Sequence, residues 1–422
     1  MPTIVSTPPV TSLIPAAAGR PGDDPIFALN AEATRRAQAG EKILNATLGA
    51  LMEDDGTLAV LPSVIDALAR VPMKKAAAYA PILGDAQFLD AVIRDLFGPT
   101  PLASLAVAAA TPGGTGALYH AVMNFLEPGQ ALLTTNYFWG PYQTIATHTG
   151  RRVETFAMFD ARGGFDLAGF ESALTRLIDR QGRALIFLNT PCHNPTGYSL
   201  DDREWAALAE IVRRHGEHAP VTLLVDLAYA RFAPAAAQNW TRHAERVLEC
   251  CTLLVAWTAS KSFAQYGARV GALVALQRDP AERARIGNAL GFSCRGTWSN
   301  CNHLGLLAIA DLLTEPALRA RADLERERLI HLLDERVGVF NREAARAGLS
   351  YPRYEGGFFV SVFTAEPQRT AASLREEGVY VVPLEQRDGG AVRVALCSTP
   401  AKDVPRLVTA LAKCSVRAAG TH

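Results

Sequence analysis

One lysine follows an apolar run directly, at a place where an amine is costly unless it is neutral or reacts. Lys261 lies in Thr258–Ser262, just after Leu253–Ala256. Desolvation and cationic neighbours lower the pKa of an amine, and the neutral amine is a nucleophile for the carbon of an aldehyde. A lysine that extends its ammonium to the surface gives the same pattern. The interpretation of Lys261 as a reactive amine therefore needs support from other residues.

Three more polar side chains follow apolar runs in the same way. Asp226 ends the run Val221–Val225, Tyr229 comes three residues later, and Asn194 lies in an Asn-Pro-Thr-Gly turn after Ile186–Leu188. A carboxylate at this depth could hold a protonated ring nitrogen, and the amide could donate a hydrogen bond to a phenolic oxygen. A helix-capping aspartate and an ordinary turn are the alternative interpretations.

A glycine-rich segment and an arginine could bind a phosphate. Gly113–Gly116 precedes a helical pattern that begins at Ala117, so its backbone N–H groups and the Thr115 hydroxyl could face an anion. The spacing is that of neither a P-loop nor a dinucleotide motif. Arg269 could supply the positive charge. Two further arginines could bind carboxylates in a bidentate manner, Arg295 and Arg393.

The apolar pattern predicts the elements that position these residues. Short apolar runs alternate with helical stretches such as Asp202–His215, which indicates an α/β fold with a mostly parallel sheet covered by helices. The predicted strands are Ala131–Thr135, Ala184–Leu188, Val221–Val225, Leu253–Ala256 and Val270–Leu276. Ligands of such sheets bind beyond the carboxyl ends of the strands, and the polar residues above stand at these ends.

The pattern changes after His303. The segment from His303 to about Gly348 is helix-forming, with an interruption near Pro316, and short strands and a last helix from about Lys402 follow it. The strands expected there are Phe358–Phe363, Val379–Val382 and Val392–Leu396. We therefore expect a smaller α+β domain. The predicted division is residues 1–55 (an N-terminal arm and part of the small domain), 56–315 (the large domain) and 316–422 (the small domain).

Composition excludes several classes of protein. Lys+Arg and Asp+Glu balance at 42 each, which gives no reason to expect nucleic acid or an anionic membrane as a partner. No run approaches the roughly 18 apolar residues of a membrane helix. The seven cysteines form no CxxC pair, Cys250 and Cys251 are expected to be buried thiols, and we expect no metal site. Residues 1–25 are expected to form a flexible arm without a signal peptide, in a reducing cytoplasmic setting.

Taken together and in this order, the motifs resemble those of fold-type I pyridoxal-phosphate enzymes. From about Asn45 to Leu411 the chain is similar to the class I aspartate and aromatic amino-acid aminotransferases. The resemblance implies pyridoxal 5'-phosphate as cofactor and transfer of an amino group between an L-amino acid and a 2-oxo acid. Dicarboxylic donors such as aspartate or glutamate are implied first, and aromatic donors stay open.

The resemblance also implies a role for each motif. Lys261 would bind the aldehyde and move the substrate α-proton, Asp226 would pair with the pyridine nitrogen, and Asn194 and Tyr229 would contact the phenolic oxygen. Trp139 would stack on the ring and touch the substrate. The phosphate would be bound by Gly114, Thr115, Thr258, Ser260 and Arg269.

Further implied roles concern the substrate and a partner subunit. Arg393 would bind the substrate α-carboxylate with help from the backbone of Gly49. Tyr79 would reach a phosphate across the interface of a symmetric homodimer, and Arg295 would bind the distal carboxylate from the partner subunit. The active sites would therefore be shared between two subunits.

Some positions depart from the family pattern and leave alternatives open. Gly113 stands where many relatives have a serine, Thr258 replaces a serine, and Tyr142 takes the place of a histidine that often supports the aspartate. The run Ser262–Gln265 also differs. A biosynthetic enzyme of the same fold that catalyses elimination, substitution, cyclisation or decarboxylation is therefore one alternative. A cofactor-binding regulator without turnover is another.

Overall fold

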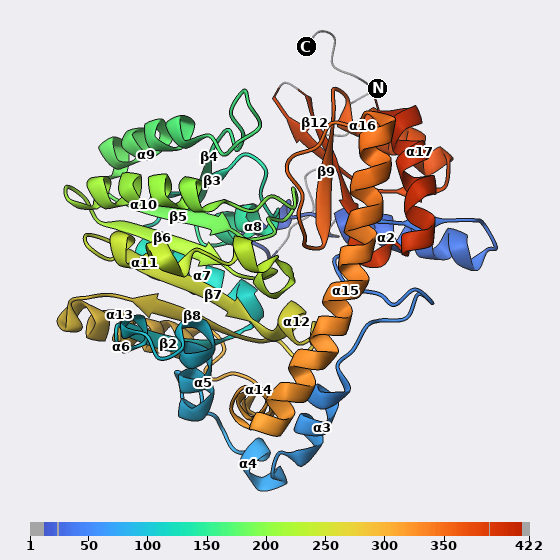
Figure 1. The fold of residues 1–422 in the computed structure, drawn as a ribbon. Coiled ribbons are helices and arrows are strands. Elements are labelled where there is room, and N and C mark those ends of the chain that lie inside the picture. Colours follow the sequence, from blue (N-terminus) through green and yellow to red (C-terminus); the bar gives the residue numbers. More distant parts are fainter. Residues whose placement is uncertain (1–11, 23–24, 388, 416–422) are drawn as a thin grey trace, which may run out of the picture.

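The computed structural model describes residues 12–22, 25–387 and 389–415, and its centre is a seven-stranded sheet (Figure 1). The strand order is β2-β8-β7-β6-β5-β3-β4. β8 is antiparallel to both neighbours, and the other paired strands are parallel. The strands are β2 (Ala106–Pro112), β3 (Ala131–Thr135), β4 (Arg152–Phe156), β5 (Ala184–Asn189), β6 (Val221–Asp226), β7 (Thr252–Thr258) and β8 (Val270–Leu276). The predicted α/β class with a mostly parallel sheet is confirmed.

Helices cover both faces of this sheet because its strands alternate apolar side chains between two cores. In β6, Leu224 belongs to one core, and Leu223 and Val225 belong to the other. The first core lies under α7 (Gly113–Phe125), α8 (Pro141–His148) and α13 (Pro280–Gly296). The second lies under α9 (Leu167–Gln181), α10 (Asp202–Gly216) and α11 (Thr241–Val247), which stand together on one side in Figure 1.

A smaller antiparallel sheet stands beside the large one. Its strand order is β11-β12-β9, with β9 (Phe359–Thr364), β11 (Val382–Gln386) and β12 (Gly389–Ala395). A parallel pair of β1 (Leu44–Asn45) and β10 (Val379–Tyr380) brings an N-terminal segment next to it. The expected smaller α+β unit is present, whereas the domain boundaries after residues 55 and 315 stay a prediction.

The remaining helices join and flank the two sheets. The long helix α15 (Pro316–Ala347) runs from α14 and α3 at one end to α17 at the other (Figure 1). The other helices are α1 (Pro15–Ala18), α2 (Pro25–Gln38), α3 (Pro62–Arg70), α4 (Met73–Ala77), α5 (Ala86–Phe97), α6 (Pro101–Ser104), α12 (Ala259–Ser262), α14 (His303–Thr314), α16 (Pro367–Glu376) and α17 (Val404–Cys414). None of the helices in residues 12–22, 25–387 and 389–415 combines the length and hydropathy that a membrane span requires.

The structure confirms the predicted strands of the large sheet to within three residues and adds two, β2 and β4. It corrects two other predictions. Val379–Val382 is not one strand, because β10 ends at Tyr380 and β11 begins at Val382. Cys250 is exposed, whereas Cys251 is buried and its thiol contacts the Val212 carbonyl. The predicted arm, residues 1–25, contains the helical turn α1, and its residues 1–11 and 23–24 lie outside the described residues.

Candidate active site

A cavity of about 170 Å³ opens at the carboxyl ends of the central strands. It lies where β2, β5, β6 and β7 end and α7 and α12 begin. Ten of the predicted site residues line it: Gly114, Thr115, Trp139, Asn194, Asp226, Tyr229, Thr258, Ser260, Lys261 and Arg269. Residues far apart in sequence thus meet because parallel strands end at one edge of a sheet.

Lys261 lies on the single turn α12, directly after β7. The Thr258 side chain caps this turn by accepting a hydrogen bond from the Ser260 N–H at 3.2 Å. The Lys261 amine lies 5.3 Å from the centre of the Tyr229 ring. Desolvation lowers the pKa of Lys261; the Asp226 carboxylate opposes this shift and the Arg269 cation adds to it. The cavity therefore favours a neutral, nucleophilic amine.

Asp226 ends β6 and is 5% exposed. Tyr142 of α8 donates its O–H to Asp226 Oδ2 at 2.8 Å, and the Ala228 N–H donates to Oδ1 at 3.1 Å. Burial raises the pKa of the Asp226 carboxyl, while these two hydrogen bonds and the Lys261 cation oppose the shift. The Tyr142 phenol is therefore a direct partner of this carboxylate, and it supplies a neutral donor.

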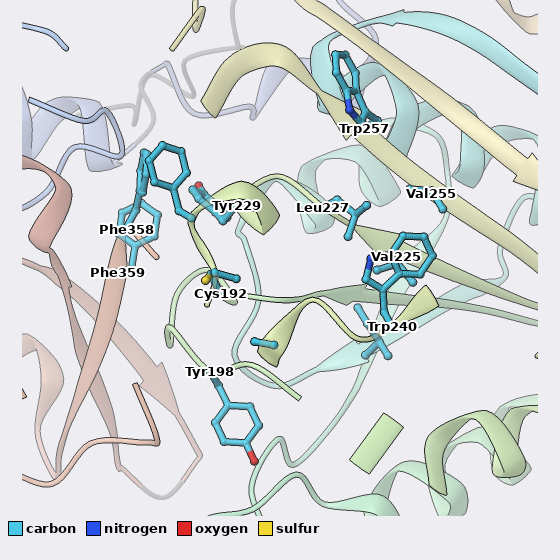
Figure 2. Close-up of a cluster of buried hydrophobic side chains, with 14 of the residues drawn as sticks. Cys192, Tyr198, Val225, Leu227, Tyr229, Trp240, Val255, Trp257, Phe358 and Phe359 are labelled. Atoms are coloured by element: carbon cyan, nitrogen blue, oxygen red, sulfur yellow. The ribbon is translucent and has the colours of Figure 1, made fainter. Parts of the chain in front are cut away.

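Asn194 connects Tyr229 to Arg393. Its Nδ2 donates to the Tyr229 hydroxyl at 3.2 Å, and its Oδ1 accepts from Arg393 Nη1 at 3.3 Å. Arg393 also donates to the Thr47 carbonyl at 2.6 Å, and its guanidinium stacks 4.3 Å from the centre of the Phe359 ring. Figure 2 shows Phe359 and Phe358 beside Tyr229 in the same buried cluster. The Arg393 guanidinium is thus placed by three different segments.

The glycine-rich turn leaves little room for a side chain at Gly113. Gly113 has φ +70°, and a Cβ there would lie 2.6 Å from Arg269 Nη2. Arg269 is held over the turn by bonds from its guanidinium to the carbonyls of Tyr266 at 2.9 Å and Pro112 at 3.4 Å. A side chain at this position would therefore be strained by the backbone conformation, and the Arg269 guanidinium would have to shift. The turn, the start of α7 and Arg269 form a cationic cradle.

The other predicted residues lie outside the cavity lining. Gly49 is close to the Arg393 stack, because a Cβ at Gly49 would lie 2.6 Å from the Phe359 ring. Tyr79 is 90% exposed after α4, although its loop is anchored by a contact between His303 Nδ1 and the Ala78 carbonyl at 2.9 Å. Arg295 is exposed near the end of α13 and donates to the Ser299 hydroxyl at 2.5 Å.

Three lining residues were not predicted: Leu118, Asn189 and Ala228. Asn189 is the informative one. Its Oδ1 accepts the Asn194 N–H at 2.7 Å and its Nδ2 donates to the Asp226 carbonyl at 2.9 Å, so it joins the ends of two strands. The signal that identified Asp226, a polar residue directly after an apolar run, was also present at Asn189.

The cavity residues fit a group that carries an aldehyde, a basic ring nitrogen and a phosphate. The Lys261 amine, whose pKa is lowered by desolvation, suits the aldehyde, the buried carboxylate of Asp226 suits a cationic nitrogen, and the glycine turn with Arg269 suits a phosphate. Together with the large sheet and the small antiparallel unit, this set defines a fold-type I pyridoxal-phosphate enzyme.

The chain belongs to the family described as aminotransferase class I and II, whose model matches residues 41–411. It is 29% identical over 348 residues to an aromatic-amino-acid aminotransferase of Paracoccus denitrificans, covering 80% of this chain and 84% of that protein. It is 27% identical over 371 residues to an aspartate aminotransferase of Pseudomonas aeruginosa, covering 85% of this chain and 90% of that protein.

Solved structures agree with this assignment. An aminotransferase from Anaerococcus prevotii matches with a TM-score of 0.89 and 31% identity, over 97% of this chain and 100% of that one. An aromatic-amino-acid aminotransferase from Burkholderia pseudomallei, covalently bound to pyridoxal phosphate, matches with a TM-score of 0.77 and 25% identity. The match covers 94% of this chain and 98% of that one. The chain is a pyridoxal-phosphate-dependent aminotransferase, and the alternative reactions of this fold are not favoured.

Substituting Gly113 by alanine tests the cradle. Gly113→Ala imposes a strained φ and displaces the Arg269 guanidinium, so we expect both a lower unfolding temperature and cofactor affinity about tenfold weaker. Gly129→Ala is the matched control, because its φ is +83° but nothing lies within 4 Å of the added Cβ. It should lower the unfolding temperature only. Titration of cofactor-free protein with pyridoxal phosphate measures the affinities, and equal affinities in the two variants would contradict the role of the close approach.

Proposed function

We propose that Lys261 binds the aldehyde carbon of the cofactor and later carries the proton to and from the substrate α-carbon. Of the six lysines in the chain, at positions 42, 74, 75, 261, 402 and 413, Lys261 is the only one that is not exposed. Its lowered pKa supports both roles, since a neutral amine is needed first as nucleophile and then as base. The observation that carries the proposal is the position of Lys261 in the cavity lining, together with Asp226 and Tyr229.

The other cavity residues would hold the cofactor in one orientation. Pyridoxal phosphate, when bound, supplies an aldehyde that takes up the amino group and a ring that withdraws electrons from the substrate α-carbon. Asp226 would keep the ring nitrogen protonated. Tyr229, whose hydroxyl accepts a bond from Asn194, keeps its own proton to donate to the ring oxygen. Trp139 would cover the ring. The phosphate would be bound by Gly114, Thr115, Thr258, Ser260 and Arg269.

Arg393 and Gly49 would bind the α-carboxylate of the substrate. The Arg393 guanidinium already lies against Asn194, which lines the cavity, and stacks on Phe359, and its planar fork has the geometry that a carboxylate binds. The distal side chain of the substrate would meet Arg295 of a second subunit. We infer dicarboxylic amino acids as the preferred donors, with aromatic donors as the second candidate because one of the compared relatives is named for them.

A visible spectrum tests this preference. L-Glutamate or L-aspartate should convert the yellow form of the wild-type protein, and 2-oxoglutarate or oxaloacetate should restore it. Arg295→Ala should slow the conversion by L-glutamate about fiftyfold or more, because a bidentate charge-assisted pair is lost, while L-phenylalanine is affected little. Faster conversion by L-phenylalanine than by L-glutamate in the wild type would overturn the dicarboxylate preference.

We propose a homodimer with shared sites. The phosphate end of the cavity is open in one chain, where Thr115 and Arg269 are exposed. Tyr79 and Phe292 are 90% and 83% exposed although both are aromatic, and α13 adjoins the Tyr79 loop through Gly291 and Leu83. An exposed apolar face of this kind suits a second copy of the chain. Tyr79 of one subunit would then cover the phosphate of the other.

Mixed dimers test the sharing. Lys261→Ala subunits lack the amine, and Tyr79→Ala subunits lack the covering tyrosine. A hybrid dimer of the two variants contains one complete site if Tyr79 acts across the interface, so we expect about half of the wild-type activity. Differently tagged subunits, co-expressed and purified through both tags, provide the hybrid. Activity no higher than that of the Tyr79→Ala homodimer would contradict the sharing.

A further inference from the structure

One face of the small sheet points at the cavity edge of the large sheet. Directly opposed residues of an antiparallel pair share a face, and alternate residues along a strand return to it. Arg393 of β12 lies opposite Ser361 of β9 and opposite Val382 of β11. Ser361 therefore lies on the same face as Arg393. Gln386 lies on this face as well, because it follows Val382 by four residues along β11.

Each polar residue of this face contacts a loop at the carboxyl ends of the large sheet. Ser361 Oγ donates to the Pro195 carbonyl at 2.9 Å, and Arg393 donates to Asn194. Gln386 bonds twice to Asn136: its Oε1 accepts from Asn136 Nδ2 at 3.1 Å, and its Nε2 donates to the Asn136 carbonyl at 2.9 Å. The Gln386 contact lies at the far end of the hairpin, about 13 Å along the strand from the level of Arg393.

Asn136 is a rigid partner for Gln386. It directly follows β3, its N–H donates to the Phe156 carbonyl at 2.8 Å, and its Oδ1 accepts the Met158 N–H at 2.8 Å. The bond from Met158 fixes which side of the amide faces the hairpin, so Nδ2 must point at Gln386. Three residues further on, Trp139 lines the cavity.

An aromatic cluster lies beside the amide pair. Phe363, on the same face of β9 as Ser361, lies 6.2 Å from Tyr137 and 6.0 Å from Phe159, ring centre to ring centre. Tyr137 and Phe159 are 6.3 Å apart. These rings give an apolar contact between the two sheets, but apolar packing is not directional. The paired hydrogen bonds set the register of the contact.

We propose that Gln386 is a positioning residue of this aminotransferase. Its two bonds with Asn136 fasten the tip of the β11–β12 hairpin to the segment that carries Trp139. Because β11 pairs with residues Gly389 to Arg393 of β12, this fastening holds Arg393 at the cavity before substrate arrives. The inference rests on the proposed function of Arg393 as the ligand of the substrate carboxylate. Its consequence is that substrate affinity depends on a residue that touches no substrate.

The test uses Gln386→Met, which keeps the length of the side chain and removes both hydrogen bonds. Gln386→Ala is a second variant, and Glu385→Ala, an exposed neighbour on the same hairpin, is the control. The first readout is amide hydrogen exchange of residues 382–395 in cofactor-free protein. The second is the dependence of spectral conversion on L-glutamate concentration in the holoenzyme, which separates an apparent Kd from a limiting rate.

Gln386→Met should speed hydrogen exchange of the hairpin and raise the apparent Kd about tenfold, with the limiting rate within about twofold of wild type. Glu385→Ala should change neither. Faster exchange with an unchanged Kd, or unchanged exchange, would overturn the positioning role. Arg393→Ala in the same assay tests the underlying proposal: if its Kd equals that of wild type, the carboxylate assignment fails; if only Arg393→Ala raises the Kd, the Gln386 inference fails alone.

Discussion

Everything at this site depends on keeping the amine of Lys261 and the carboxylate of Asp226 together in one desolvated cavity. Desolvation pushes both groups toward their neutral forms, because a charge costs free energy in a medium of low polarity. The amine can stay neutral, which makes it reactive. The carboxylate has to stay ionised to hold a cationic ring nitrogen, and the Tyr142 O–H and the Ala228 N–H are the donors that favour its ionised form.

The fold satisfies this constraint with two separate sheets. The large sheet supplies rigid strand ends, so that Asp226, Asn189 and Lys261 are placed by backbone hydrogen bonds rather than by long loops. The small sheet supplies Arg393 and stacks Phe359 beneath it. The contacts between the sheets run through Asn194, Pro195 and Asn136, all at the same edge. The groups that bind cofactor and substrate therefore belong to one connected network.

Much of this network could be predicted from local sequence. Asp226 and Lys261 stand out because a charged residue follows a run that must be buried, and the parallel topology then brings such residues together. Tyr142 could be placed only by resemblance, since nothing in its surrounding sequence indicates a bond to a carboxylate 84 residues away. The Asn136–Gln386 pair spans 250 residues and has no local signal at all.

The missed or misplaced elements have physical reasons as well. β2 is rich in alanine, which favours helix, and β4 carries the charged residues Arg152 and Glu154 at the edge of the sheet. The exposure of Cys250 could not be predicted, because Cys250 and Cys251 lie in the turn between α11 and β7, where burial of one side chain does not imply burial of its neighbour. Tyr79 and Arg295 lie outside the cavity of a single chain, so their assigned roles depend on a second subunit.

The most direct measurement is the site of covalent attachment. Holoenzyme reduced with borohydride and digested should yield one peptide that carries the phosphopyridoxyl mass, and fragmentation should place that mass on Lys261. A Lys261→Arg variant treated in the same way should carry none. The mass on one of the five exposed lysines, or an unmodified Lys261 in a protein that still turns over amino acids, would contradict the role given to this residue.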